Sequence, residues 1–168
     1  MQSHQTRRRA ALIVDIQVGL FNGPETPHGG AQVLANINEL IVKARRVGAS
    51  ILVARHTGPQ GSSIEPDSPL TRLLPDLTVD AVADVMIEKS RPNCFLGTGL
   101  ADSLRAASVD ELIIVGMKTE YCIDTTCRAA ADLSFQPVLV ADAHTSMASF
   151  GRAISRGYES RTFATARA

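Results

Sequence analysis

Short, mainly apolar runs alternate along this chain with stretches of helical periodicity, and this alternation most limits its fold. Strands without a polar face are typical of parallel sheets that are covered on both sides, because neither face meets water. The runs cover residues 10–16, 50–54, 82–87, 111–115 and 137–141, and a weaker sixth covers 162–165. The pattern predicts an α/β fold with a parallel sheet and right-handed crossover helices.

The segments between these runs predict helices and one long loop. Apolar residues recur at helical spacing over 31–47, and Gly48 stands where a helix commonly ends. Shorter helices are expected over 100–107 and 121–133. The segment 55–71 contains two glycines and three prolines. A loop of this length in a compact domain usually serves a function.

The length of 168 residues suits one domain. Residues 1–9 are polar and basic, so we expect a flexible leader there and a single domain over 10–168. The apolar stretch that follows the leader ends at Asp15, too early for a signal peptide. Apart from the sixth strand, the arginine-containing stretch after Phe150 predicts no clear element.

Composition excludes several classes of partner. Lys plus Arg is 17 and Asp plus Glu is 17, so there is no basic excess of the kind that binds nucleic acid. No apolar run is long enough to span a membrane. We therefore expect a soluble, cytoplasmic protein with neither nucleic acid nor membrane as partner. Cys94, Cys122 and Cys127 show no CxxC spacing, and an odd number of cysteines leaves at least one free.

Three reactive residues follow the ends of predicted strands: Asp15, Lys89 and Cys122. Ligands of parallel α/β sheets bind beyond the carboxyl ends of the strands. Cys122 opens a predicted helix, where the helix dipole favours a thiolate, and a carboxylate and an ammonium complete a nucleophile, base and stabiliser. The alternative is that Asp15 caps a loop, Lys89 is solvated and Cys122 is a small buried apolar residue.

Three ordered motifs give the chain a resemblance to a known family. They are Ala11 to Gln17, then Glu88 and Lys89 followed by Phe95 and Thr98, then Val115 to Thr126 followed by Ala129 and Ala130. Through these motifs the chain resembles the isochorismatase-like cysteine hydrolases. The resemblance runs from about residue 10 to about residue 144. That superfamily includes nicotinamidases, N-carbamoylsarcosine amidohydrolases and related amidases, with streptothricin hydrolase as one similar relative.

The resemblance implies a Rossmann-like three-layer α/β/α fold with a mainly parallel sheet of about six strands. It implies a catalytic triad of Asp15, Lys89 and Cys122, and a cis peptide bond between Met117 and Lys118. The backbone N–H groups of Lys118 and Cys122 then form the oxyanion hole.

On this resemblance we expect an amidohydrolase that cleaves a C–N bond of a small amide. Cys122 forms a thioester, Asp15 acts as general base and acid, Lys89 counters the negative charge, and no cofactor is required. Relatives that cleave the vinyl ether of isochorismate lack the cysteine. Two alternatives remain open: an isochorismatase-type vinyl ether hydrolase, and a protein that uses the same fold only for ligand binding or assembly.

The pocket and the partners follow from the same resemblance. The residues expected to line the substrate pocket are Gln17, Phe21, His56, Phe95, Thr119 and Tyr121. Nicotinamidases bind a metal through an Asp-x-His pair, whereas this chain has Ala54, Arg55 and His56, so we expect no metal. Family members are commonly oligomers, so we also expect a homo-oligomer, dimeric or larger.

Overall fold

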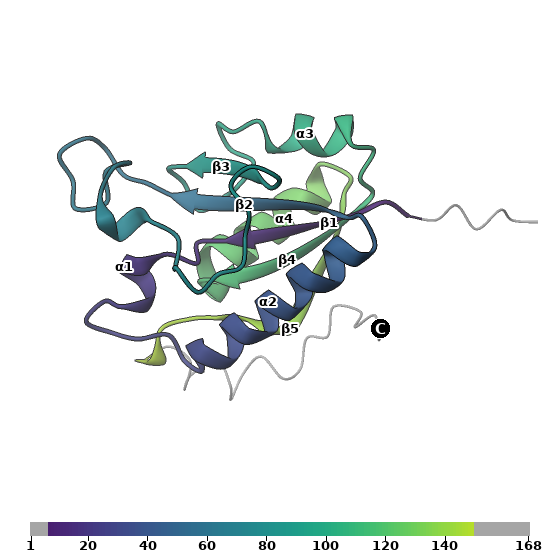
Figure 1. Cartoon of the computed structure of the whole chain (residues 1–168). Helices are drawn as coiled ribbons and strands as arrows, with labels where there is room; N and C mark the ends of the chain where they lie inside the picture. The colour runs from purple at the N-terminus through teal and green to yellow at the C-terminus, as the bar shows by residue number, and fades with distance from the viewer. Residues whose placement is uncertain (1–6, 150–168) are drawn as a thin grey trace, which may run out of the picture.

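A parallel sheet forms the centre of the computed structural model, which describes residues 7–149. Five strands lie in the order β3-β2-β1-β4-β5 within this part of the chain (Figure 1). They are β1 (Arg9–Val14), β2 (Ser50–His56), β3 (Val85–Lys89), β4 (Glu111–Met117) and β5 (Gln136–Thr145). The predicted α/β fold with a mainly parallel sheet is therefore confirmed. The predicted sixth strand, residues 162–165, lies outside the described residues.

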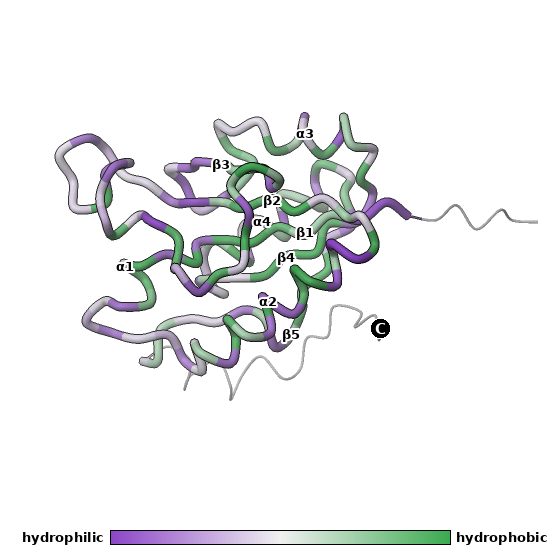
Figure 2. The backbone as a smooth tube through the Cα atoms, viewed as in Figure 1, coloured by the Kyte–Doolittle hydropathy of each residue, from purple (hydrophilic) through white to green (hydrophobic). Residues whose placement is uncertain are grey.

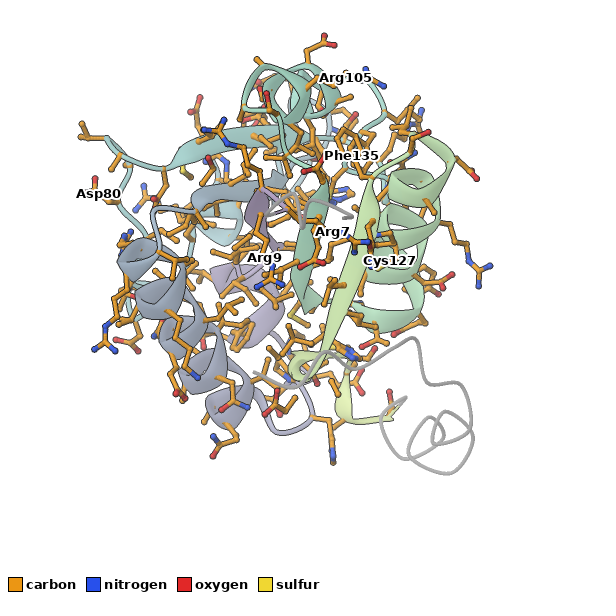
Figure 3. All side chains as sticks on the ribbon, turned by 90° about the vertical axis from the view of Figure 1, so that its right-hand side faces the viewer. Arg7, Arg9, Asp80, Arg105, Cys127 and Phe135 are labelled. Atoms are coloured by element: carbon orange, nitrogen blue, oxygen red, sulfur yellow. The ribbon has the colours of Figure 1, made fainter. Side chains whose placement is uncertain are left out.

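Helices cover both faces of the sheet. They are α1 (Val18–Phe21), α2 (Gly30–Arg46), α3 (Leu100–Ala106) and α4 (Asp124–Asp132), with a 3₁₀ turn η1 (Pro69–Thr71) and a π-helical turn η2 (Thr119–Ile123). In Figure 1, α2 crosses the front of the sheet and α4 lies behind it, and Figure 3 shows the two helices on opposite sides. No helix in the described part is long and apolar enough to cross a membrane.

Strand alternation produces two separate cores. On β1, Leu12 and Val14 pack in the cluster that includes α3 and α4, whereas Ala11 and Ile13 pack against α2. Both sets are at most 1% exposed, which explains why the strand is apolar at every position after Arg9. Figure 2 shows the same concentration of hydrophobic residues along the central strands.

The strand boundaries differ from the sequence-based prediction, most clearly in β1, β3 and β5. β1 begins at Arg9, inside the predicted leader, because Arg9 pairs with Glu111 of β4 at 2.6 Å. β3 begins at Val85 rather than 82, because the Asp80 carboxylate accepts hydrogen bonds from two backbone N–H groups of the preceding turn. β5 continues to Thr145, since its pairing with β4 resumes after a register shift.

Candidate active site

The three reactive residues predicted from the sequence meet at the carboxyl edge of the sheet. Lys89 is the last residue of β3, Asp15 follows β1, and Cys122 lies in η2 after β4. The Lys89 Nζ atom lies 2.8 Å from Asp15 Oδ2 and 3.4 Å from Cys122 Sγ. One ammonium therefore contacts both the carboxylate and the sulfur.

Lys89 is fixed by further contacts. Its side chain is 0% exposed, and Nζ also donates to the Arg91 carbonyl oxygen at 3.2 Å. Burial alone would lower the pKa of Lys89, but the negative charge of Asp15, with smaller contributions from Cys94 and Cys122, outweighs it, so the pKa is raised. Lys89 is thus a permanent cation in this site.

His56, at the end of β2, also contacts this cation. Its Nδ1 atom lies 3.0 Å from Lys89 Nζ. An ammonium has no acceptor, so Nδ1 accepts and the ring proton is assigned to Nε2. Burial, and then the charge of Lys89, lower the pKa of His56. We therefore assign His56 as a neutral ring that presents an N–H donor at Nε2.

The backbone at Asp15 holds the carboxylate in place. Asp15 has φ of 56°, in the left-handed region that Asp tolerates better than most residues. Its N–H donates to the Ala54 carbonyl at 3.0 Å, and its own carbonyl accepts from Gln17 N at 3.0 Å. The side chain is 2% exposed, and Oδ1 has no hydrogen-bond partner among residues 7–149. This oxygen is available to accept a proton.

The turn that carries Cys122 begins with a cis peptide bond between Met117 and Lys118. The Lys118 carbonyl accepts hydrogen bonds from the N–H groups of Tyr121 at 3.1 Å and Ile123 at 3.2 Å, which closes the π-helical turn. Burial, and then the negative charge of Asp15, raise the pKa of Cys122 to about 12. A helix dipole alone favours a thiolate, but in the structure the desolvation of Cys122 dominates and the resting group is a thiol.

A close approach of β4 to β1 precedes this turn and depends on Gly116. Its φ is 122°, and a Cβ added there would lie 2.0 Å from the Val14 carbonyl oxygen. Only glycine fits this conformation and this spacing. Gly116 therefore sets the separation of the two strand ends that lead to Asp15 and Cys122.

A cavity of about 340 Å³ opens above these residues. Its lining comprises Asp15, Gln17, Gly19, Leu20, His56, Ile64, Leu70, Pro92, Lys118, Tyr121 and Cys122. Of the six predicted pocket residues, Gln17, His56 and Tyr121 are in this lining. The Gln17 amide already has hydrogen-bond partners within the protein. It donates to the carbonyls of His56 and Thr71 at 2.9 Å and accepts from His56 N at 2.8 Å. Gln17 therefore ties β1 to β2 and to the long loop.

The structure places the other three predicted pocket residues away from this lining, within the described residues. Phe21 packs against the α2 core, and its neighbour Leu20 lines the cavity instead. Phe95 stacks on Phe135 with ring centroids 5.8 Å apart, and Figure 3 shows Phe135 on the side of the sheet that α3 covers. Thr119 forms a hydrogen bond to His144 Nδ1 at 2.9 Å and lines a second cavity.

Individual cavity residues of the long loop were not predicted from the sequence. Ile64 and Leu70 come from the segment 55–71, and they form an apolar wall. Their apolar character within a polar loop was the available signal. Gly19 allows η1 to approach, since a Cβ there would lie 2.9 Å from the Leu70 Cβ.

Three side chains of this site are of types that bind metal ions, but their surroundings do not suit a metal ion. Single donor atoms of Asp15, His56 and Cys122 lie within 4.8 Å of one another. The Lys89 ammonium, however, contacts all three residues at 2.8 to 3.4 Å. It occupies the place of a cation, and a second positive charge there would be repelled.

Comparison with known proteins gives a consistent family match. The model of the isochorismatase domain matches residues 9–161. A streptothricin hydrolase of Streptomyces noursei is 33% identical over 137 residues, which cover 81% of this chain and 49% of that protein. The chain spans about half the length of the two streptothricin hydrolases that it matches.

Solved structures agree with the fold. An isochorismatase from Pseudomonas putida KT2440 is 31% identical with a TM-score of 0.75, covering 82% of this chain and 70% of that one. An N-carbamoylsarcosine amidase from Thermoplasma acidophilum has a TM-score of 0.76 over 90% of this chain and 92% of that one. Its identity is 19%, so it supports the fold alone.

Proposed function

Because the chain belongs to the isochorismatase family, we propose that it is a cysteine hydrolase that cleaves an amide C–N bond of a small molecule. The observation that carries the proposal is the contact of one buried ammonium with both the Asp15 carboxylate and the Cys122 sulfur. The relative named streptothricin hydrolase adds support.

In the first step, Asp15 takes the proton of Cys122 while the sulfur attacks the amide carbonyl carbon. Asp15 Oδ1 is the oxygen with no other partner among the described residues. Since the pKa of Cys122 is raised to about 12, proton transfer accompanies the attack and no thiolate accumulates beforehand. The backbone N–H groups of Lys118 and Cys122 receive the developing oxyanion, and such donors contribute about 3 kcal/mol each in other enzymes.

In the second step, the C–N bond breaks and protonated Asp15 returns its proton to the leaving nitrogen. The acyl group remains on Cys122 as a thioester, and ammonia or an amine departs. Water then attacks the thioester with Asp15 as base, which releases the acid and restores the thiol. Lys89 stays charged throughout and offsets the negative charge, whichever atom carries it.

Turnover of a panel of small amides by three proteins tests this function. The panel contains nicotinamide, N-carbamoyl compounds and a lactam, and the products are ammonia or amine and the acid. We expect wild type and Cys127→Ala to be active and Cys122→Ala to lose activity. Cys127 is the matched control, because it lies in the next helix, α4, and lines the other cavity.

Acid quenching during turnover tests directly for the thioester intermediate. An acyl adduct on the Cys122 peptide is expected, and hydroxylamine should remove it. Turnover that persists in Cys122→Ala would refute the nucleophilic role. An absence of turnover, together with no faster alkylation of Cys122 than of Cys94 and Cys127, would favour a binding or assembly function.

A further inference from the structure

Lys118 brings a second cation to the proposed active site, and no step of the proposed reaction uses its side chain. Lys118 follows the cis peptide bond and lines the cavity together with Cys122. Its residue is partly buried. Across residues 7–149 the structure records neither an ion pair nor a hydrogen bond of its ammonium group. Lys118 is thus a residue of the cavity lining whose ammonium group has no counter-ion among those residues.

The remaining charges of the cavity cancel. Asp15 and Lys89 neutralise each other at 2.8 Å, and the pKa of His56 is lowered, which keeps the ring neutral. The walls consist of Leu20, Ile64, Leu70, Pro92 and Tyr121, none of which is charged at neutral pH. Among the lining residues, Lys118 is therefore the one whose charge no other lining residue balances.

One carboxylate outside the cavity, that of Glu25, also interacts electrostatically with Lys118. Glu25 is fully exposed, and its pKa is lowered mainly by its hydrogen bonds with Ser149 and to a smaller extent by Lys118. The Glu25 Oε1 atom accepts from Ser149 N at 2.7 Å. Glu25 is therefore held by another partner, in water, and leaves the Lys118 ammonium available to a ligand.

We propose that Lys118 makes this cavity selective for amides that carry an anionic group, with a carboxylate as the simplest case. The inference rests on the proposed function, because it concerns the substrate of the same cysteine. A cation beside apolar walls attracts an anion more strongly than it would in open water, since those walls exclude part of the solvent. A carboxylate bound there also gains a charge-assisted hydrogen bond.

The position of Lys118 limits the shape of this substrate. In the proposed mechanism its backbone N–H contacts the scissile carbonyl, and its side chain extends from the same residue. The anionic group must therefore lie within one lysine side chain of the scissile amide, and the body between them faces the apolar wall. A cationic amide of the same shape is repelled by the same ammonium.

Two alkylating reagents of nearly equal size, one anionic and one neutral, test this inference. Iodoacetate is an anion, and iodoacetamide is its neutral amide. The rate of Cys122 alkylation by each reagent is measured by peptide mass spectrometry for wild type, Lys118→Gln, Lys118→Arg and Lys43→Gln. The rate ratio of the two reagents is normalised to the same ratio for free cysteine. Any overall change in the reactivity of Cys122 cancels in this ratio.

We expect the normalised ratio to favour iodoacetate in wild type and to fall by about tenfold in Lys118→Gln. Lys118→Arg should retain the wild-type preference, because it keeps the charge. Lys43→Gln loses an equal charge on the exposed surface of α2, where Lys43 pairs with Glu39, and should leave the ratio unchanged.

Two outcomes overturn the inference and differ from each other. Alkylation of Cys122 by both reagents with the same ratio in wild type and Lys118→Gln would refute the role of Lys118 and leave the nucleophilic cysteine intact. A Cys122 that neither reagent modifies would refute the proposed function itself, and the inference with it.

Discussion

Replacing Lys89 with methionine is expected to cost about 3–5 kcal/mol of folding free energy, the usual cost of removing one partner of a buried ion pair. Lys89 and Asp15 side chains are 0% and 2% exposed and lie 2.8 Å apart. At an effective dielectric constant of about 20, two charges at this distance attract by about 6 kcal/mol. Methionine fills similar space but leaves the Asp15 carboxylate buried without a counter-charge, and this charge is the source of the loss.

A double-mutant cycle separates this charge effect from lost packing. Asp15→Asn keeps the size of the side chain, and asparagine tolerates the left-handed backbone at φ 56°. Each single variant leaves one buried charge alone, whereas the double variant leaves none. We therefore expect the double variant to be more stable than the sum of the single losses predicts, by about 2 kcal/mol or more.

Urea unfolding of the four proteins, followed by circular dichroism, measures these free energies. Lys43→Met is the matched control, because Lys43 is 61% exposed and its pair with Glu39 lies on the surface. Its loss should stay within about 0.5 kcal/mol. Losses in the cycle that add within about 0.5 kcal/mol would show that Asp15 and Lys89 are not energetically coupled, and would refute the argument.

Three further outcomes follow from the same structure. Gly116→Ala should lower stability by about 3 kcal/mol or more in urea unfolding, because its Cβ would lie 2.0 Å from a backbone oxygen; Gly99→Ala, which meets nothing within 4 Å, should be tolerated. Burial lowers the pKa of His56 and His144 from 6.5, so the unfolded chain binds more protons below that pH and stability should fall as pH decreases below 6.5. His144→Gln should reduce this slope, and an unchanged slope would contradict the prediction. The alkylation rate of Cys122 by iodoacetamide should keep rising through pH 10, since its pKa is raised to about 12; a plateau below pH 9 would show a preformed thiolate.

The position of the site could be predicted because it depends on strand order and on few side chains. Asp15 and Cys122 follow strands and Lys89 ends one, and the carboxyl ends of parallel strands share one edge. Strands buried on both faces are visible in the sequence as uninterrupted apolar runs. The bounds of β3 and β5 were less accurate, because the Asp80 turn and the register shift are local features without an apolar signal.

The walls of the cavity could not be predicted in the same way. Leu20 and Phe21 are neighbours on one short helix and point in directions about 100° apart. Which of them faces the cavity is decided by how α1 packs against the α2 core. Phe95 was placed in the pocket by resemblance, but stacking on Phe135 draws it into the core. Such choices depend on contacts between distant segments, and local pattern carries no information about them.

The geometry around Lys89 explains how a thiol with a pKa raised to about 12 can act as a nucleophile in the proposed reaction. Ionising a buried thiol alone would create an uncompensated charge, which is costly. Transfer of the proton to Asp15 instead moves one negative charge from the carboxylate to the sulfur. Because Lys89 Nζ lies 2.8 Å from the carboxylate and 3.4 Å from the sulfur, the same ammonium stabilises the charge before and after the transfer. The number of charges in the site does not change, so the activation of Cys122 requires the ion pair as a unit, and loss of Lys89 should abolish turnover even where the fold survives.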